Sequence, residues 1–314
     1  MADKLMKEVF TDYVKELMTA DEKVVLLDAD LAKCIGDNKL WADFPDRTFD
    51  VGIAEANMAG IAAGLSAYGF KPIITTFAPF ATRRIADQIM ISLAYAKQNV
   101  VIVGTDPGIC AELNGGTHMP FEDIGMLRSI PNVTIYEPTD IVELKKVLPE
   151  IMKFEGVTYV RLNRKNPPIC YSEADTDRLA LRKADVIREG KDVTVIASGI
   201  MVSTALEARE ELLKEGIDAE VVVCHTVKPI DEETIIASVK KTGAAVTLEN
   251  HNVCGALRSA VCETICENYP VPVQSVGVKE KFGEVGKMPY LRKVFNMETA
   301  DAVNAIKKVI SMKK

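Results

Sequence analysis

Short runs rich in Val, Ile and Leu alternate with longer segments of helical periodicity, and this alternation limits the fold more than any other feature of the chain. Polar residues, Gly or Pro bound each run, as expected for strands buried in a parallel sheet. In the first half the runs occupy residues 23–30, 72–77, 99–104, 132–138 and 157–163. The helical segments between them occupy residues 57–69, 83–98, 121–130 and 140–154. The pattern predicts an α/β domain with a doubly wound, mostly parallel sheet.

A polar and charged stretch, residues 171–192, interrupts the alternation, which restarts after it. We therefore expect a first domain over residues 1–175, a linker over 176–190 and a second, smaller α/β domain over 191–314. In the second domain the expected strands are 193–199, 218–231, 244–252 and 272–280, and the expected helices are 201–215, 232–242 and about 255–268. A chain of 314 residues is long enough for two domains of ordinary size.

Composition excludes several classes of function. The formal net charge of −7 argues against nucleic acid or an anionic membrane as the main partner, because both select basic surfaces. No apolar run approaches the roughly 20 residues of a membrane span, and residues 1–17 indicate an amphipathic helix rather than a signal peptide. We expect a cytoplasmic location. The 7 cysteines are scattered without a C-x-x-C, so neither a disulfide framework nor a metal site on this chain is expected.

Common catalytic motifs are missing from the sequence. It has no P-loop, no G-x-G-x-x-G fingerprint and no G-x-S-x-G elbow. Of the 3 histidines, His118 lies in "ELNGGTHMPFED", a polar segment of the kind that binds ligands at the ends of α/β strands. An ordinary loop histidine is the alternative interpretation.

Glu55 lies in "FDVGIAEANMAGIAAGLSAYGF", inside an otherwise apolar, Gly- and Ala-rich run that follows Asp50, where a short strand is expected to turn into a helix. One interpretation is an acid stabilised by the positive end of the helix dipole. The other is a carboxyl group in an apolar pocket, completed by Phe77 and Phe80 of "TTFAPFATRR". An acid and two aromatic rings could hold a flat heteroaromatic ring, stacked on one face and hydrogen-bonded at its rim.

Three stretches resemble the pyrimidine-binding domain of transketolases: "FDVGIAEANMAGIAAGLSAYGFKPIITTFAPFATRRIADQI", "GGTHMPFEDIGMLRSIPNVTIYEPTD" and "VRLNRK". "LENHNVCGALRSAV" and "VQSVGVKEKFGEVG" resemble the C-terminal domain of the same enzymes. The order and spacing match over nearly the whole chain. Deoxyxylulose-phosphate synthases and the β subunits of oxo-acid dehydrogenases share the "IAE" feature, whereas the "THMPFEDIGMLRSIPN" loop favours transketolase or the synthase.

The resemblance implies thiamine diphosphate as cofactor and a role for each matching residue. Glu55 would hydrogen-bond N1′ of the cofactor's pyrimidine and assist proton transfer, with burial favouring its protonated form. Phe77 and Phe80 would stack on that ring. His118 would contact the substrate near its reacting oxygens, and Arg164 would bind a substrate phosphate with its planar guanidinium.

The family's G-D-G motif with a downstream Asn, which holds the diphosphate and Mg²⁺, has no counterpart in this sequence. Full-length transketolases are longer and carry that domain first. The resemblance therefore implies the C-terminal subunit of a split transketolase, whose N-terminal partner subunit supplies the diphosphate and Mg²⁺ site. We expect self-association into a dimer-based assembly with two copies of each chain, and no catalysis by this chain alone.

Two departures from the family lie at the substrate end. Asp106, in "TDPGI", replaces a phosphate-binding histidine, and Asn114, in "LNGGTH", replaces an aspartate that contacts a sugar hydroxyl. An anionic side chain facing a phosphate would weaken its binding, so the substrate is either unphosphorylated at that end or bound by a rearranged loop. Alternatively, Asp106 caps the turn before Pro107 and Gly108.

Three functions remain open at this point. The first is a transketolase subunit that transfers a two-carbon ketol unit from a ketose to an aldose, with a sugar or sugar phosphate as substrate. The second is a subunit of another thiamine diphosphate enzyme, resembling the synthase or the dehydrogenase β subunit. The third is a non-catalytic regulatory or scaffolding relative, against which the retained Glu55 argues, because a scaffold needs no buried acid.

Overall fold

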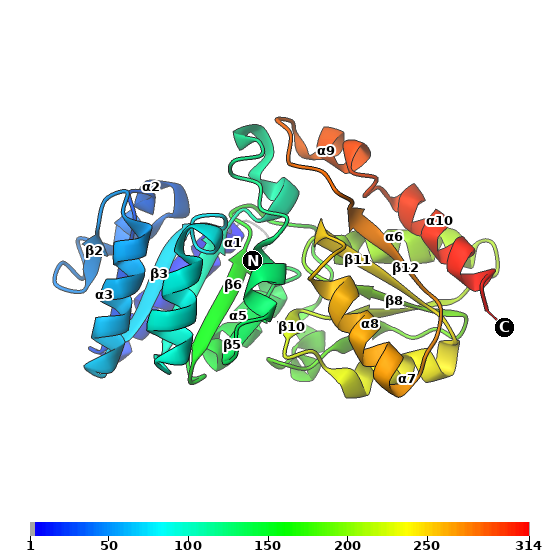
Figure 1. Cartoon of the computed structure of the whole chain (residues 1–314), viewed down its shortest axis with the longest axis horizontal. Coiled ribbons are helices and arrows are strands. Elements are labelled where there is room, and N and C mark those ends of the chain that lie inside the picture. Colours follow the sequence, from blue (N-terminus) through cyan, green and yellow to red (C-terminus); the bar gives the residue numbers. More distant parts are fainter. Residues whose placement is uncertain (1–3, 314) are drawn as a thin grey trace.

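Seven strands form the first of two sheets in this computed structural model, which describes residues 4–313 (Figure 1). They are β1 (Val24–Asp28), β2 (Thr48–Asp50), β3 (Lys71–Phe77), β4 (Val100–Thr105), β5 (Val133–Tyr136), β6 (Val157–Leu162) and β10 (Thr226–Lys228). Their order across the sheet is β10-β5-β6-β4-β3-β1-β2. All neighbours run parallel except β10, which pairs antiparallel with β5.

Helices cover both faces of this sheet. They are α1 (Met6–Ala20), α2 (Ala32–Ile35), α3 (Glu55–Ala67), α4 (Asp123–Arg128) and α5 (Ile141–Ile151), with the shorter or irregular helices η1 (Asp37–Leu40), η2 (Arg83–Ile85), η3 (Gln88–Tyr95) and η4 (Gly108–Asn114). Along β1, Val25 and Leu27 belong to the core under α3 and η3, whereas Val24 and Leu26 belong to the core under α1 and α5. Alternate residues of a strand point to opposite faces, so two cores form. The doubly wound fold is confirmed.

Five strands form the second sheet, in the order β12-β11-β8-β9-β7. They are β7 (Asp185–Arg188), β8 (Val193–Ala197), β9 (Ala219–Val223), β11 (Ala245–Asn252) and β12 (Val273–Val278). The helices of this part are η5 (Glu173–Arg178), α6 (Met201–Leu213), α7 (Glu232–Thr242), α8 (Leu257–Asn268), α9 (Met288–Val294) and α10 (Thr299–Ile310). The sheet is parallel except for β7, and Figure 1 shows the two α/β parts side by side.

Three details differ from the expectations. The predicted linker, 176–190, contains β7, an edge strand with partly exposed residues that therefore lacks an apolar run. The predicted strand 218–231 divides into β9 and β10, and β10 joins the first sheet. The predicted helix 83–98 is a 3₁₀ turn followed by the π-helix η3, which periodicity cannot distinguish from an α-helix. The domain limits themselves stay a prediction.

A buried ionic network joins the two parts. Arg161, on β6, is fully buried and donates from Nε to Asp123 Oδ2 at 2.7 Å and from Nη1 to Glu137 Oε1 at 2.5 Å. From the second part, the Asn250 carbonyl oxygen accepts from Arg161 Nη2 at 2.8 Å, and Ser198 Oγ donates to Glu137 Oε2 at 2.7 Å. Because a buried charge needs partners at fixed positions, this network fixes how the two parts meet.

The interface between the two parts also positions the loop after β4. The Asn250 side chain donates to the Pro107 carbonyl oxygen at 3.0 Å and accepts from the Ile109 amide at 2.9 Å. Gly108 lies between them with φ of +54°, and a Cβ there would lie 2.2 Å from Asn250 Oδ1. The second part of the chain thus determines the path of the loop that starts at Asp106. No helix within residues 4–313 has the length and apolar character needed to cross a membrane.

Candidate functional site

The predicted site residues lie at the carboxyl ends of neighbouring parallel strands. Glu55 is the first residue of α3, which follows β2, and Phe77 is the last residue of β3. Asp106 directly follows β4, and Arg164 is the second residue after β6. Since β6, β4, β3, β1 and β2 are consecutive and parallel in the sheet, their carboxyl ends form one edge, where ligands of open α/β sheets bind.

His118 completes an aromatic cluster with the two phenylalanines. The ring centroids of Phe77 and Phe80 are 6.1 Å apart, and the His118 ring lies edge-on at 5.8 Å from Phe77 and 5.2 Å from Phe80. Phe77 is buried, whereas Phe80 and His118 are partly exposed. The structure therefore brings together Phe77, Phe80 and His118, although Phe77 and His118 are 41 positions apart in the sequence.

Glu55 is buried beside this cluster and forms an ion pair with Arg84. Arg84 Nη1 donates to Glu55 Oε1 at 2.5 Å, and the guanidinium carbon lies 3.7 Å from the centroid of the Phe80 ring. The residue Glu55 is only 3% exposed, while the Arg84 side chain is 42% exposed. The site thus accepts a flat group whose N–H donors reach Glu55 and whose face stacks on Phe80. Arg83 and Arg84 form the basic pair at the end of "TTFAPFATRR", and nothing in the sequence indicates the contact between Arg84 and Glu55.

Arg83, the other member of the basic pair, holds the loop of His118. Its guanidinium donates to the Thr117 carbonyl oxygen at 2.6 Å and to Glu122 Oε1 at 2.9 Å. Thr117 Oγ1 is 2.8 Å from Nδ1 of His118. Burial, and then the positive charges of Arg84 and Arg83, lower the pKa of His118 below its usual value. The imidazole is therefore neutral at neutral pH and can accept a proton.

Asp106 and Arg164, predicted as separate substrate contacts, bind each other. The Arg164 backbone amide donates to Asp106 Oδ1 at 3.0 Å, and the guanidinium donates from Nε to Asp106 Oδ2, with which Nη2 also forms an ion pair. The guanidinium carbon is also 5.0 Å from the Phe77 centroid. Burial raises the pKa of Asp106, and the Arg164 charge opposes this effect. Arg164 is therefore paired before any ligand arrives.

Asn114 lies apart from the other predicted residues. It is the last residue of η4 and is exposed to solvent, and no side-chain hydrogen bond connects it with Glu55, His118 or Arg164 within residues 4–313. Its predicted contact with substrate stays a prediction.

The loop before His118 packs against a segment of the second part, residues 281–286. A Cβ on Gly116 would lie 2.6 Å from the Gly283 carbonyl oxygen, and one on Gly115 would lie 2.8 Å from Val285 Cγ2. Only glycines permit this approach, so the position of His118 depends on the second part of the chain. In the part of the chain that the structure describes, no three His, Cys, Asp or Glu side chains gather to hold a metal ion.

Comparisons with known proteins agree with these features. Residues 3–169 match the transketolase pyrimidine-binding domain, and residues 182–301 match the transketolase C-terminal domain. The chain is 46% identical to a 6-deoxy-6-sulfo-D-fructose transketolase subunit of Clostridium sp. (strain MSTE9), covering 98% of this chain and 95% of the relative. A 1-deoxy-D-xylulose-5-phosphate synthase of Desulforudis audaxviator is 35% identical over 94% of this chain but only 46% of its own length.

A solved structure has the same fold throughout. It is described as a split gene transketolase, inactive beta4 tetramer, and superposes with a TM-score of 0.89 at 38% identity, covering 99% of both chains.

Proposed function

Because this chain belongs to the transketolase family, among its split subunits, we propose that it binds the aminopyrimidine half of thiamine diphosphate and acts with a separate diphosphate-binding subunit. The assembled enzyme would transfer a two-carbon ketol unit from a ketose to an aldose. The observation that carries this proposal is the buried Glu55 carboxyl group beside the Phe77 and Phe80 rings.

The residues present fit the cofactor's aminopyrimidine. The Arg84 guanidinium now makes the two contacts that a protonated aminopyrimidine would make, a hydrogen bond to Glu55 and stacking on Phe80. When bound, thiamine diphosphate supplies a carbon nucleophile and holds the electron pair left by C–C cleavage. Glu55 would hold the ring nitrogen and its proton, and neutral His118 would receive or return a proton at a substrate hydroxyl.

Arg84 must leave the pocket before the pyrimidine enters, so its ion pair competes with the cofactor. We expect Arg84→Met, which keeps the length but removes the donors, to tighten cofactor binding by the assembled enzyme about two- to tenfold. Calorimetric titration with thiamine diphosphate and Mg²⁺ measures this. Arg83→Met is the matched control, because Arg83 does not contact Glu55. Weaker binding by Arg84→Met would mean that Arg84 helps to hold the cofactor.

The partner subunit would cover the outer face of α3 and η3. α3 exposes small residues there, including Ala56, Gly60 and Gly64, and η3 exposes Ile91 at 51% and Tyr95 at 82%. This apolar face is continuous with Glu55, which begins α3, so a subunit seated on it would complete the pocket. We propose that the occupant carries the diphosphate and Mg²⁺ site and that two copies of each chain assemble. The cytoplasmic location stays a prediction.

The Asp106–Arg164 pair leaves little positive charge for a substrate phosphate. We expect Asp106→Asn and Asp106→His, both compatible with the φ of +52° at this position, to release Arg164. Each variant should raise the preference in kcat/KM for a phosphorylated over an unphosphorylated aldose acceptor about tenfold. Steady-state kinetics of the assembled enzyme checks this. An equal loss on both acceptors would identify Asp106 as a structural turn residue.

Product analysis tests the proposed activity against its alternative. Given an aldose acceptor, the assembled enzyme should release an aldose shortened by two carbons from a ketose phosphate or from 6-deoxy-6-sulfo-D-fructose, the sugar for which one relative is named, and should lengthen the acceptor by the same two carbons. It should not consume pyruvate. Release of CO₂ from pyruvate, with no ketol transfer, would instead support a synthase-like or dehydrogenase-like subunit, as the more distant match to a deoxyxylulose-phosphate synthase allows.

A further inference from the structure

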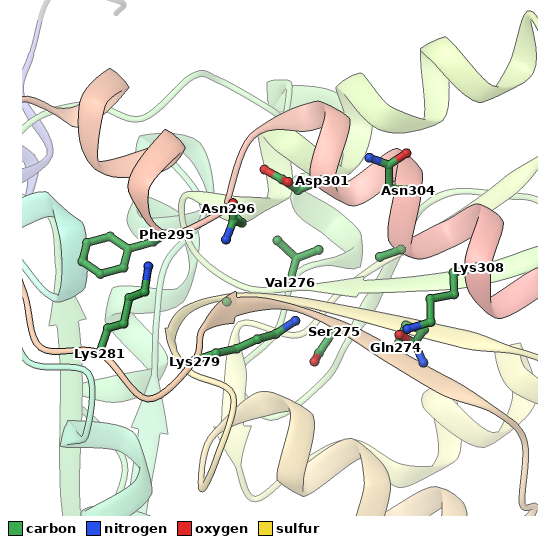
Figure 2. Close-up of a pocket in the computed structure, with 12 residues that line it drawn as sticks. Gln274, Ser275, Val276, Lys279, Lys281, Phe295, Asn296, Asp301, Asn304 and Lys308 are labelled. Carbon is green, nitrogen blue, oxygen red and sulfur yellow. The ribbon is translucent and has the colours of Figure 1, made fainter.

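A polar hollow lies in the second part of the chain, between the edge strand β12 and the helix α10 (Figure 2). Its volume is about 230 Å³, and none of the predicted site residues lines it. β12 pairs with β11 on one side only, and within residues 4–313 no strand covers its other edge. We call this feature the lysine hollow, after Lys279, Lys281 and Lys308, which line it.

Positive charge predominates in the lysine hollow. Figure 2 shows Lys279 and Lys281 extending from the segment after β12 and Lys308 from α10. Asp301 is the one carboxylate among the lining residues, and its Oδ2 accepts from the Glu298 amide at 3.0 Å. The lining therefore carries three ammonium groups, spread along the hollow in Figure 2, and one carboxylate that already accepts a hydrogen bond, in a chain whose net charge is −7.

All three of these ammonium groups lack an anionic partner within residues 4–313. Among the residues that the structure describes, Lys279 and Lys308 form neither an ion pair nor a side-chain hydrogen bond, and Lys281 donates only to the Val294 carbonyl oxygen, at 3.2 Å. Lys307, the neighbour of Lys308 on α10, differs, because it pairs with Glu215 at 2.6 Å. The lysines of the hollow thus keep their donors for a ligand.

The other lining groups suit an anion of limited size. The amide side chains of Asn296 and Asn304 lie at the α10 side of the lysine hollow (Figure 2) and can donate hydrogen bonds. Ammonium and amide donors together bind phosphate and carboxylate oxygens. The volume is below the roughly 300–1,000 Å³ of pockets for drug-sized ligands, which favours a small metabolite. The net negative charge of the chain disfavours a long polyanion such as nucleic acid.

We propose that the lysine hollow binds a small metabolite with a phosphate or similar dianionic group, and that its occupancy is transmitted to the loop of His118. The chain that carries Lys279 and Lys281 continues into residues 281–286, the segment against which Gly115 and Gly116 pack. A ligand that fixes the start of this segment would also restrict the loop beside it. This would make the hollow a regulatory site on the second part of the chain.

Binding of inorganic phosphate to the isolated chain, followed by calorimetry, tests the site without depending on the proposed function. We expect the double variant Lys279→Gln/Lys308→Gln to weaken phosphate binding about tenfold or more. The control Lys293→Gln/Lys307→Gln changes the net charge equally, outside the hollow, and should stay within about twofold. Phosphate binding that persists in the first variant, for example at Arg164, would overturn the proposal, as would a lack of saturable binding in the parent chain.

Hydrogen exchange measured by mass spectrometry tests the transmission. Phosphate should slow exchange of the backbone amides in residues 281–286 and 115–119 of the parent chain, and should not do so in Lys279→Gln/Lys308→Gln. Slower exchange confined to β12 and α10 would contradict the regulatory role.

Discussion

Glu55→Gln should slow exchange of the thiazolium C2 proton of the bound cofactor by a factor of about 10² or more in the assembled enzyme. Glutamine keeps the shape and one hydrogen bond of Glu55 but cannot share an ionisable proton with the pyrimidine nitrogen, and loss of acid–base assistance has effects of this size. Gln has nearly the size of Glu, and the ion-pair partner Arg84 is partly exposed to solvent, so the substitution should leave the fold intact. The rate of deuterium incorporation, followed by NMR after acid quench, measures the effect.

Glu122→Gln is the matched control. Glu122 pairs with Arg83 as Glu55 pairs with Arg84, but it is more exposed and lies outside the aromatic cluster. Its variant should exchange the C2 proton at nearly the parent rate. If Glu55→Gln also exchanges at the parent rate, Glu55 is only an acid at a helix N-terminus, and its proposed role in proton transfer is wrong.

Gly60→Lys should abolish assembly with the diphosphate-binding subunit while leaving the isolated chain folded. A Cβ at Gly60 meets nothing within 4 Å, and lysine is a better helix former than glycine, so the melting temperature should stay equal or rise. In the assembly, the ammonium group would be buried against an apolar partner surface, at a cost of several kcal/mol. This corresponds to a loss of affinity between the subunits of about 100-fold or more.

Ala237→Lys places the same charge on an exposed position of α7, in the second part of the chain, and serves as the control. Analytical ultracentrifugation of the mixed subunits measures assembly in both variants. Normal assembly of Gly60→Lys would show that the outer face of α3 does not bind the partner.

The sequence predicted the strands of both sheets because buried parallel strands carry continuous apolar runs, such as "KVVLLD" and "NVVIVG". From strand-to-helix junctions it also predicted that Glu55, Phe77 and Phe80 form one pocket, and the resemblance to transketolases added His118 to this site. β7 could not be predicted, because an edge strand of four residues leaves too short a pattern, and no local pattern showed that the predicted strand 218–231 would divide and send β10 to the first sheet.

Side-chain pairing was beyond sequence reasoning. The contact between Asp106 and Arg164 depends on β4 and β6 being adjacent and in register, which no local pattern encodes. Arg161 gave no signal either, because a single arginine in the strand "VTYVRL" is expected to face solvent, whereas its partners come from both parts of the chain. The sequence also predicted an apolar pocket around Glu55, whereas the structure places the Arg84 guanidinium against its carboxyl group.

Binding of thiamine diphosphate to this chain, alone and mixed with a diphosphate-binding subunit, tests the central claim most directly. In the proposed assembly the Glu55 pocket would hold only the pyrimidine half of the cofactor, and residues 4–313 gather no metal-binding cluster for the diphosphate. Calorimetry in the presence of Mg²⁺ should therefore show weak binding by the isolated chain and binding tighter by about 100-fold or more in the mixture. Tight one-to-one binding by the isolated chain would contradict the account, because it would place a complete cofactor site on this subunit.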